Sequence, residues 1–152
     1  MKDSKNNINS KVNYTETNTV STETCKLQPD NLQYDRDGLI PAVIQDARTE
    51  AVLMVGYMNR EALRRTMESG KVWFWSRSRR VYWLKGETSG NFFEVSALYA
   101  DCDADTLLVK VRLHGQGAAC HTGRYSCFFN LLAGFPPPAP LQPYSGAGKS
   151  DD

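Results

Sequence analysis

The chain has 152 residues, of which 41% are hydrophobic and 23% are charged, and its formal net charge at neutral pH is +1. This length and composition indicate one soluble globular domain with a single core. They exclude a membrane-spanning protein, since no stretch approaches the roughly 20 apolar residues that a span needs. The small net charge also gives no overall electrostatic field that would attract nucleic acid. The N-terminus lacks the apolar core of a secretory signal, so we expect a cytoplasmic protein.

The two ends of the chain differ in composition from its middle. Residues 1–33 are rich in Asn, Thr, Ser and Lys, and their few apolar side chains cannot offset the entropy lost on ordering. A transit peptide is disfavoured because this tail carries acidic residues and no arginine. Five of the seven prolines lie within 136–143. We predict a disordered tail over 1–33, a folded domain over 34–134 and a flexible tail over 135–152.

The first half of the domain is predicted to form a β-hairpin and then a helix. Apolar runs over 39–44 and 51–57 are separated by a short polar break, as in two adjacent strands. The side chain of Asn59 can cap the helix, and Gly70 can end it. Two Glu–Arg pairs, each four residues apart within 61–68, support this helix.

The second half of the domain is predicted to consist of strands. Aromatic and β-branched runs cover residues 72–75, 81–84, 92–99 and 107–113. We therefore predict a β-dominated α+β domain with one main helix and a mixed or antiparallel, half-barrel-like sheet. A sheet in a domain of about 100 residues leaves a face or an edge exposed, and dimerisation is one way to cover it.

Three aspartates alternate with a cysteine within five residues, as Asp101, Cys102, Asp103 and Asp105. In an extended segment the carboxylates lie on one side and the thiol on the other. Oxygen ligands suit Mg²⁺, whereas thiolates suit Zn²⁺. A solvated acidic turn is the alternative for the aspartates, and the residue types alone leave both interpretations open.

Cys120 and Cys127 enclose six residues around a glycine turn. With Cys102 they offer three thiolates and no evident fourth ligand, which leaves a position on Zn²⁺ open for water. Such a water has a pKa of about 7 and yields hydroxide at neutral pH. The alternative is three buried cysteines that act as small hydrophobes. His121 lies beside a predicted ligand and is the candidate for proton relay.

A basic and aromatic stretch lies between these segments and the helix. Residues 76–80 read Ser-Arg-Ser-Arg-Arg, Trp83 follows, and residues 85–90 read Lys-Gly-Glu-Thr-Ser-Gly. The arginines and Lys85 can bind phosphate, N–H groups near the glycines can cradle it, and the indole can stack on a base. A solvated hairpin or an RNA-binding surface would use the same residue types, so composition leaves these alternatives open.

Taken together, six motifs in chain order resemble phosphoribosyl-AMP cyclohydrolases of histidine biosynthesis. They are LIPAVIQD over 39–46, MNREAL over 58–63, SRSR over 76–79, WLKGETSG over 83–90, DCDAD over 101–105 and CHTGRYSC over 120–127. The resemblance implies hydrolytic opening of the adenine ring of 1-(5-phosphoribosyl)-AMP between N1 and C6. It also implies an intertwined homodimer, with one zinc ion per subunit bound by thiols of both subunits and with magnesium bound by the aspartates.

Matching positions assign the site residues that this resemblance implies. The zinc ligands are Cys102, Cys120 and Cys127, and the magnesium ligands are Asp101, Asp103 and Asp105. We expect zinc-bound hydroxide to attack C6 and His121 to carry the proton that breaks the C6–N1 bond. The expected contacts to the phosphates, ribose and base are Arg77, Arg79, Trp83, Lys85, Glu87, Thr88 and Ser89.

Two rival functions use similar residues. A zinc-dependent base deaminase would need His-x-Glu and Pro-Cys-x-x-Cys motifs, and neither occurs. A zinc-stabilised RNA-binding module remains the alternative, and it predicts salt-dependent RNA affinity without turnover. The sequence also departs from the family pattern in a longer loop over 114–117 and in Asn91, where family members often have histidine. The chain ends too soon for the pyrophosphohydrolase domain that some relatives carry, so we expect a single activity.

Overall fold

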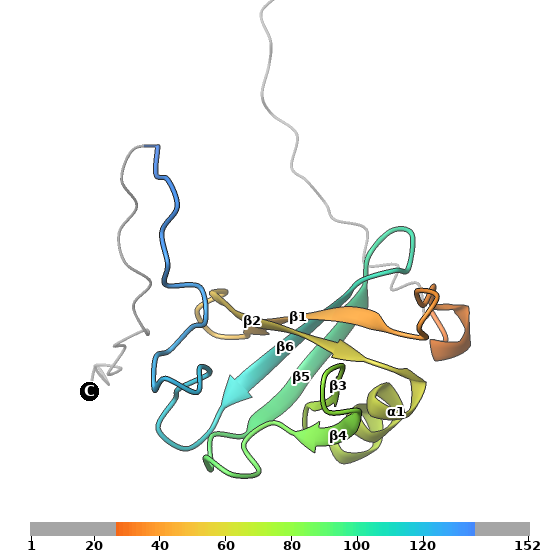
Figure 1. Cartoon of the computed structure of the whole chain (residues 1–152), viewed down its shortest axis with the longest axis horizontal. Helices are drawn as coiled ribbons and strands as arrows, with labels where there is room; N and C mark the ends of the chain where they lie inside the picture. Colours follow the sequence, from red (N-terminus) through yellow and green to blue (C-terminus); the bar gives the residue numbers. More distant parts are fainter. Residues whose placement is uncertain (1–26, 136–152) are drawn as a thin grey trace, which may run out of the picture.

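The computed structural model describes residues 27–135, and Cys25 and most of both predicted tails lie outside them. Figure 1 shows one helix packed beside a set of strands. The elements are η1 (Pro29–Asn31), β1 (Ile40–Asp46), β2 (Val52–Met58), α1 (Arg60–Ser69), β3 (Trp73–Ser76), β4 (Val81–Leu84), β5 (Phe93–Ala100) and β6 (Leu107–Leu113). The predicted β-dominated α+β class with one main helix is confirmed.

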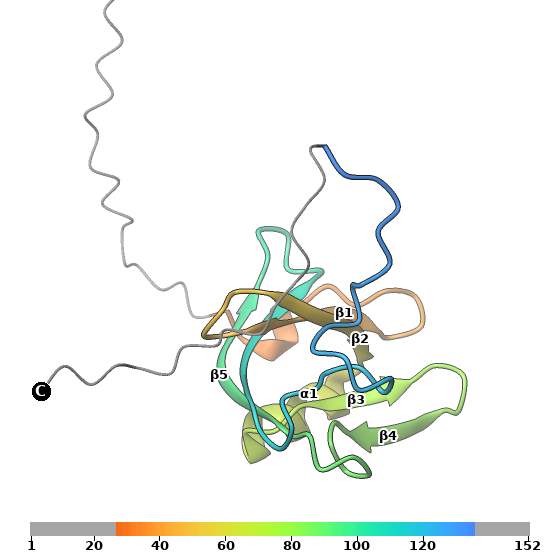
Figure 2. The same cartoon turned by 90° about the vertical axis from the view of Figure 1, so that its left-hand side faces the viewer.

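The strands form one mixed sheet and one separate hairpin. The sheet has the order β2-β1-β6-β5, in which β1 pairs with β2 and β6 with β5 in antiparallel fashion, while β1 and β6 run parallel. The hairpin of β3 and β4 contacts β2 and α1 and projects from the body of the domain (Figure 2). The mixed sheet that we predicted is therefore present, and its centre is the parallel pair β1–β6.

The core lies where the inward faces of β1 and β6 meet α1 and the hairpin. Along β1, buried residues alternate with half-buried ones, as a strand with one face on the core requires. The same alternation begins β6. The core residues that hold these elements together include Ile40, Ile44, Leu53, Met58, Leu63, Val72, Phe74, Phe93, Leu107, Val109 and Val111.

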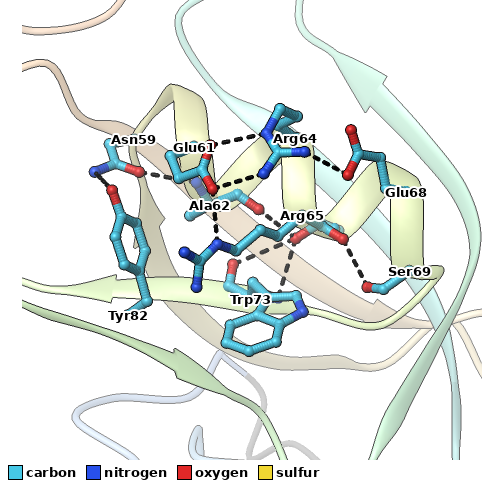
Figure 3. Close-up of polar contacts among 10 residues, drawn as sticks. Asn59, Glu61, Ala62, Arg64, Arg65, Glu68, Ser69, Trp73 and Tyr82 are labelled. Atoms are coloured by element: carbon cyan, nitrogen blue, oxygen red, sulfur yellow. Dashed lines mark hydrogen bonds and ion pairs between the residues drawn. The ribbon is translucent and has the colours of Figure 1, made fainter.

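Helix α1 begins and ends at the residues that the sequence indicated. The Asn59 side chain accepts a hydrogen bond from the N–H of Ala62 at 2.9 Å, and Gly70 ends the helix with a φ of 67°. Both predicted Glu–Arg pairs form on its exposed face (Figure 3). The amide of Asn59 also donates to the Tyr82 hydroxyl at 3.1 Å, which ties the start of the helix to β4.

The described chain joins the domain slightly ahead of residue 34, where we placed the domain's start. Leu32 is buried in the core, and the N–H of Gln33 donates to the carbonyl of Ala104 at 2.8 Å. The sequence gives only a weak signal for this start of the domain, because a single apolar residue, Leu32, anchors the segment to the core. Among residues 27–135 there is no helix with the length and hydropathy that a membrane span requires.

Candidate functional site

A short hairpin after β6 brings the thiols of Cys120 and Cys127 together. The N–H of Cys120 donates to the carbonyl of Arg124, and the N–H of Gly123 donates to the carbonyl of Cys120, both at 3.0 Å. Gly123 has a φ of 83°, a conformation that favours glycine at this turn. Beyond the turn, the N–H of Cys127 donates to the carbonyl of Leu53 at 2.7 Å. The second thiol is thereby tied to β2.

The two thiols differ in their electrostatic surroundings. The Thr122 hydroxyl donates to the sulfur of Cys120 at 3.1 Å, and this hydrogen bond is the main reason that the pKa of Cys120 is lowered. Burial raises the pKa of Cys127 to about 11, and its hydrogen bond with Cys120 acts in the same direction. The charge of Cys120 also raises the pKa of Cys127, because the two thiols lie close enough to interact. The donor set therefore fits a thiophilic cation such as Zn²⁺, which replaces both protons.

Lys85 lies beside this thiol pair rather than in solvent. Its side chain is buried, and its ammonium lies 5.1 Å from the centre of the Phe93 ring. Burial lowers the pKa of Lys85, while the charges of Cys120 and Cys127 act in the opposite direction. The sequence predicted a phosphate contact for this lysine, and that role stays a prediction. Its position makes it a positive charge next to the thiol pair.

Asp101, Asp103 and Asp105 gather in the turn between β5 and β6. Each offers an oxygen within 4.8 Å of the others, and no other group of three or more potential ligands of this type occurs among the described residues. The N–H groups of Asp105 and Thr106 donate to one carboxylate oxygen of Asp101 at 3.0 and 3.1 Å. These backbone hydrogen bonds fix the first carboxylate of the cluster.

Mutual repulsion is visible in this cluster. The charges of Asp101 and Asp105 raise the pKa of Asp103. Burial acts to raise the pKa of Asp101, but the hydrogen bonds from the N–H groups of Thr106 and Asp105 outweigh it and lower that pKa. Three carboxylates on one exposed turn therefore concentrate negative charge that a divalent cation would offset.

Cys102 does not join Cys120 and Cys127 within one chain. It is exposed in the β5–β6 turn, whereas the other two follow the far end of β6 (Figure 1). The seven residues of β6 alone separate those ends by about 20 Å, at about 3.3 Å per residue. The three thiols therefore do not gather into one site within the described chain.

A pocket of about 620 Å³ opens between β2 and the β3–β4 hairpin. Three of the predicted substrate-binding residues line it, namely Arg77, Arg79 and Trp83. The guanidinium of Arg77 lies 3.8 Å from the centre of the Tyr57 ring, which holds it at the pocket wall. The other lining residues are Met54, Val55, Gly56, Tyr57, Phe74, Trp75, Ser76 and Ser78.

Gly56 lines this pocket and packs so closely on Phe74 that there is no room for a side chain. A Cβ atom there would lie 2.3 Å from a ring carbon of Phe74, which is fully buried. Trp83 also packs on Phe74, with ring centres 4.8 Å apart. The sequence analysis did not identify Gly56 or Tyr57, although a glycine within an apolar strand is a signal for close backbone approach.

Replacing Gly56 with alanine is therefore expected to lower the free energy of unfolding by about 1–3 kcal/mol, because overpacking forces Phe74 out of place. Urea unfolding followed by tryptophan fluorescence measures this change. Val55→Ala is the control, since Val55 is 43% exposed and its truncation is expected to change stability by less than about 1 kcal/mol. Equal stability of Gly56→Ala and the parent protein would show that Gly56 and Phe74 are not tightly packed.

The segment that follows the loop over 85–90 contacts the loop after β6. Glu87, Thr88 and Ser89 are exposed on it and do not line the Arg77 pocket. The Asn91 side chain accepts the N–H of Gln116 at 2.8 Å, so the longer loop over 114–117 packs directly against this segment. Asn91 and the loop over 114–117, the two predicted departures from the family pattern, are therefore in contact with each other.

The two histidines occupy different surroundings. His121 is exposed and adjacent to Cys120, in reach of solvent, which suits the predicted proton relay. His114 instead forms a 2.7 Å contact with Glu94, whose pKa is lowered chiefly by that hydrogen bond. His114 therefore makes a surface contact between the segment after β6 and strand β5.

One polar group next to the thiols was missed by the sequence analysis. The Tyr125 hydroxyl donates to the Asp46 carboxylate at 2.6 Å and lies 2.5 Å from the Thr49 hydroxyl. Burial raises the pKa of Tyr125, and the hydrogen bond to Asp46 adds to that increase. Burial acts to raise the pKa of Asp46, but its hydrogen bonds, foremost that from Tyr125, lower it overall. No local pattern links residues 79 positions apart.

Comparison with known proteins identifies the family. A family model described as phosphoribosyl-AMP cyclohydrolase matches residues 54–129. The phosphoribosyl-AMP cyclohydrolase of Pelotomaculum thermopropionicum is 62% identical over 103 residues, which cover 68% of this chain and 78% of that protein. The protein of the same name from Nitrosomonas europaea is 54% identical over 103 residues, with coverage of 68% and 79%.

A histidine biosynthesis bifunctional protein from Gloeobacter violaceus is 56% identical over 102 residues, which cover 67% of this chain and 46% of that protein. The family match includes the thiol pair, the aspartate cluster and the arginines of the pocket. The resemblance that the motifs indicated is therefore confirmed. This chain belongs to the phosphoribosyl-AMP cyclohydrolase family.

Proposed function

We propose that the protein hydrolyses the adenine ring of 1-(5-phosphoribosyl)-AMP between N1 and C6, as a step of histidine biosynthesis. The observation that carries this proposal is the 62% identity over 103 residues to a protein named phosphoribosyl-AMP cyclohydrolase. Attack of water on C6 followed by cleavage of the C6–N1 bond adds one water to the substrate and releases no fragment. The relatives' names supply the reaction, and the geometry of this chain supports roles for its residues.

Zinc is proposed to bind Cys120 and Cys127 of one subunit together with Cys102 of a second copy. The adjacent thiols and the exposed, distant position of Cys102 support this arrangement. When bound, zinc would supply activation of water for hydrolysis at neutral pH. Lys85 offsets the negative charge of the thiolates, since its buried ammonium lies near both. His121 is proposed to hold the proton that N1 receives when its bond to C6 breaks.

A homodimer is proposed because the chain exposes apolar residues directly after the second thiol. The side chain of Leu132 is 99% exposed and that of Phe135 is 91% exposed, and such a segment is typical of a protein interface. Pairing of two chains would bury it while bringing Cys102 of one chain to the thiol pair of the other. The exposed apolar residues of this segment are Phe128, Phe129, Leu131, Leu132 and Phe135.

The phosphates and ribose are proposed to bind through magnesium at the aspartate cluster and through the pocket beside the β3–β4 hairpin. Arg77 and Arg79 supply positive charge with planar donors that match phosphate oxygens. Trp83 shapes the pocket by packing on Phe74. Contacts from Glu87, Thr88 and Ser89 are proposed on the exposed loop that precedes Asn91.

Incubation of the purified protein with phosphoribosyl-AMP tests the proposal. We expect a change in ultraviolet absorbance as the ring opens, loss of that change with a zinc chelator, and its return when zinc is added. Turnover that is insensitive to the chelator would contradict the zinc role but leave the reaction standing. The RNA-binding alternative predicts no turnover and salt-dependent RNA affinity, so the same preparation distinguishes the two.

Arg77→Ala is expected to raise the KM for phosphoribosyl-AMP about tenfold, because a charge-assisted hydrogen bond to phosphate is worth about 1.5–3 kcal/mol. Steady-state kinetics measure the change. Arg80→Ala is the matched control, since Arg80 lies in the same turn but does not line the pocket. Equal KM values for the two variants would argue that the pocket does not bind the phosphate.

A further inference from the structure

Tyr125 connects the thiol hairpin to the turn between β1 and β2. Its backbone carbonyl accepts the N–H of Ala119 at 3.2 Å, so it belongs to the hairpin that carries Cys120. Its side chain extends the other way, to Asp46 at the end of β1 and to Thr49 in the following turn. The side chain of Tyr125 therefore links these two segments by hydrogen bonds.

The hydroxyl groups at this contact form a chain with one consistent direction. The N–H of Ala51 donates to the Thr49 hydroxyl at 3.2 Å. The Tyr125 hydroxyl donates its one proton to the Asp46 carboxylate, and this leaves the Thr49 hydroxyl as the donor to the Tyr125 oxygen. Asp46 is only 3% exposed and also accepts the N–H of Arg48 at 2.8 Å. Consecutive hydrogen bonds of this kind strengthen one another where water is excluded.

The next residues extend the same attachment to the second thiol. The Ser126 hydroxyl donates to the carbonyl of Val52 at 2.8 Å, and the N–H of Cys127 donates to the carbonyl of Leu53. Three consecutive residues therefore make hydrogen bonds to the end of β1, the β1–β2 turn and the start of β2, namely Tyr125, Ser126 and Cys127. Tyr125 and Ser126 both lie between Cys120 and Cys127, and of these two it is Tyr125 whose side chain reaches Asp46 and Thr49.

We propose that Tyr125 is a positioning residue that sets the separation of Cys120 and Cys127 through Asp46 and Thr49. This inference rests on the proposed role of those cysteines as zinc ligands. The tyrosine does not touch the metal or the reacting atoms. It holds the hairpin so that both sulfurs face one point before the metal arrives, which reduces the ordering that metal binding must impose.

Tyr125→Phe removes one oxygen atom and keeps the ring, so it tests the hydrogen-bond chain directly. We expect zinc affinity to fall about tenfold or more, as for loss of other partners that orient metal ligands. Competition with a chromophoric zinc chelator measures the affinity. We also expect the thiols of the metal-free protein to react several-fold faster with a thiol reagent, because the hairpin opens more often.

Two further variants separate positioning from a general loss of stability. Tyr82→Phe also removes a tyrosine hydroxyl that makes a hydrogen bond, at 3.1 Å to Asn59, but away from the thiols. It is expected to leave zinc affinity and thiol reactivity unchanged. Thr49→Val is expected to weaken zinc binding less than Tyr125→Phe, and the double variant is expected to match Tyr125→Phe alone, since both side chains act in one chain of hydrogen bonds.

The outcomes distinguish this inference from the proposed function. If the wild-type protein binds zinc and Tyr125→Phe binds it equally well, with unchanged thiol reactivity, the positioning role is wrong while the zinc site stands. If Tyr82→Phe weakens zinc binding as much as Tyr125→Phe, the effect is one of stability and the inference is overturned. If the wild-type protein binds no zinc, the zinc site is contradicted and the positioning role fails with it.

Discussion

Cys102→Ser chains and Cys120→Ser chains are each expected to lose zinc and turnover when expressed alone, yet to regain activity when they are expressed together. Each single variant removes one thiolate from every site of its homodimer, and we expect activity to fall more than about a hundredfold. In a mixed dimer, one of the two sites combines Cys102 of one chain with Cys120 and Cys127 of the other. That site is intact.

The expected recovery is about a quarter of the wild-type activity, because random pairing makes about half of the dimers mixed and each mixed dimer has one intact site of two. Size-exclusion chromatography and metal analysis accompany the activity measurement. Co-expression of Cys120→Ser with Cys127→Ser is the control and is expected to stay inactive, since both cysteines are supplied by the same chain. Recovery in that control, or none with Cys102→Ser in a dimeric sample, would contradict the shared site.

Asp103→Asn is expected to raise the magnesium concentration needed for half-maximal activity about a hundredfold. The substitution keeps the size of the side chain and removes one of three charges that face one another on the β5–β6 turn. Because the affinity of such sites follows the number of charged ligands, the loss is expected to appear in the metal dependence. Titration of magnesium at saturating substrate measures it.

Asp37→Asn, an exposed aspartate outside the cluster, is the matched control and is expected to keep the wild-type magnesium dependence. An unchanged dependence for Asp103→Asn would show that the carboxylates only shape the turn. The stability of the magnesium-free protein gives a second comparison between Asp103→Asn and the parent. The substitution removes one charge and so relieves the repulsion that raises the pKa of Asp103. Asp103→Asn is therefore expected to unfold no more easily than the parent protein in the absence of magnesium.

Local signals in the sequence were enough to predict helix α1 and the strands β1 to β6. Helix α1 begins after Asn59 and ends at Gly70, as the capping pattern predicted, because caps depend only on neighbouring residues. The order of strands was not predicted. The parallel pairing of β1 with β6 joins segments about 65 residues apart, and hydrophobic periodicity carries no information on which strands meet.

In the site too, contacts between residues close in sequence were predicted, whereas contacts between distant residues were not. The approach of Cys120 to Cys127 follows from a glycine turn between them, and the sequence predicted it. The burial of Lys85 beside those thiols was not predicted, because a lysine in a glycine-containing loop is ordinarily solvated. The contact of Tyr125 with Asp46 depends on how the chain returns to β1, which only the folded structure defines.

The mass of the product formed from phosphoribosyl-AMP tests the proposed reaction most directly. Ring opening between N1 and C6 keeps every nitrogen atom and adds the mass of one water, and in ¹⁸O-labelled water the new oxygen is found in the carboxamide. Deamination at C6 would instead exchange an amino group for oxygen. We predict a product equal to substrate plus one water, with the label in the carboxamide. A product that has lost ammonia, or an unchanged substrate, would contradict the proposed function.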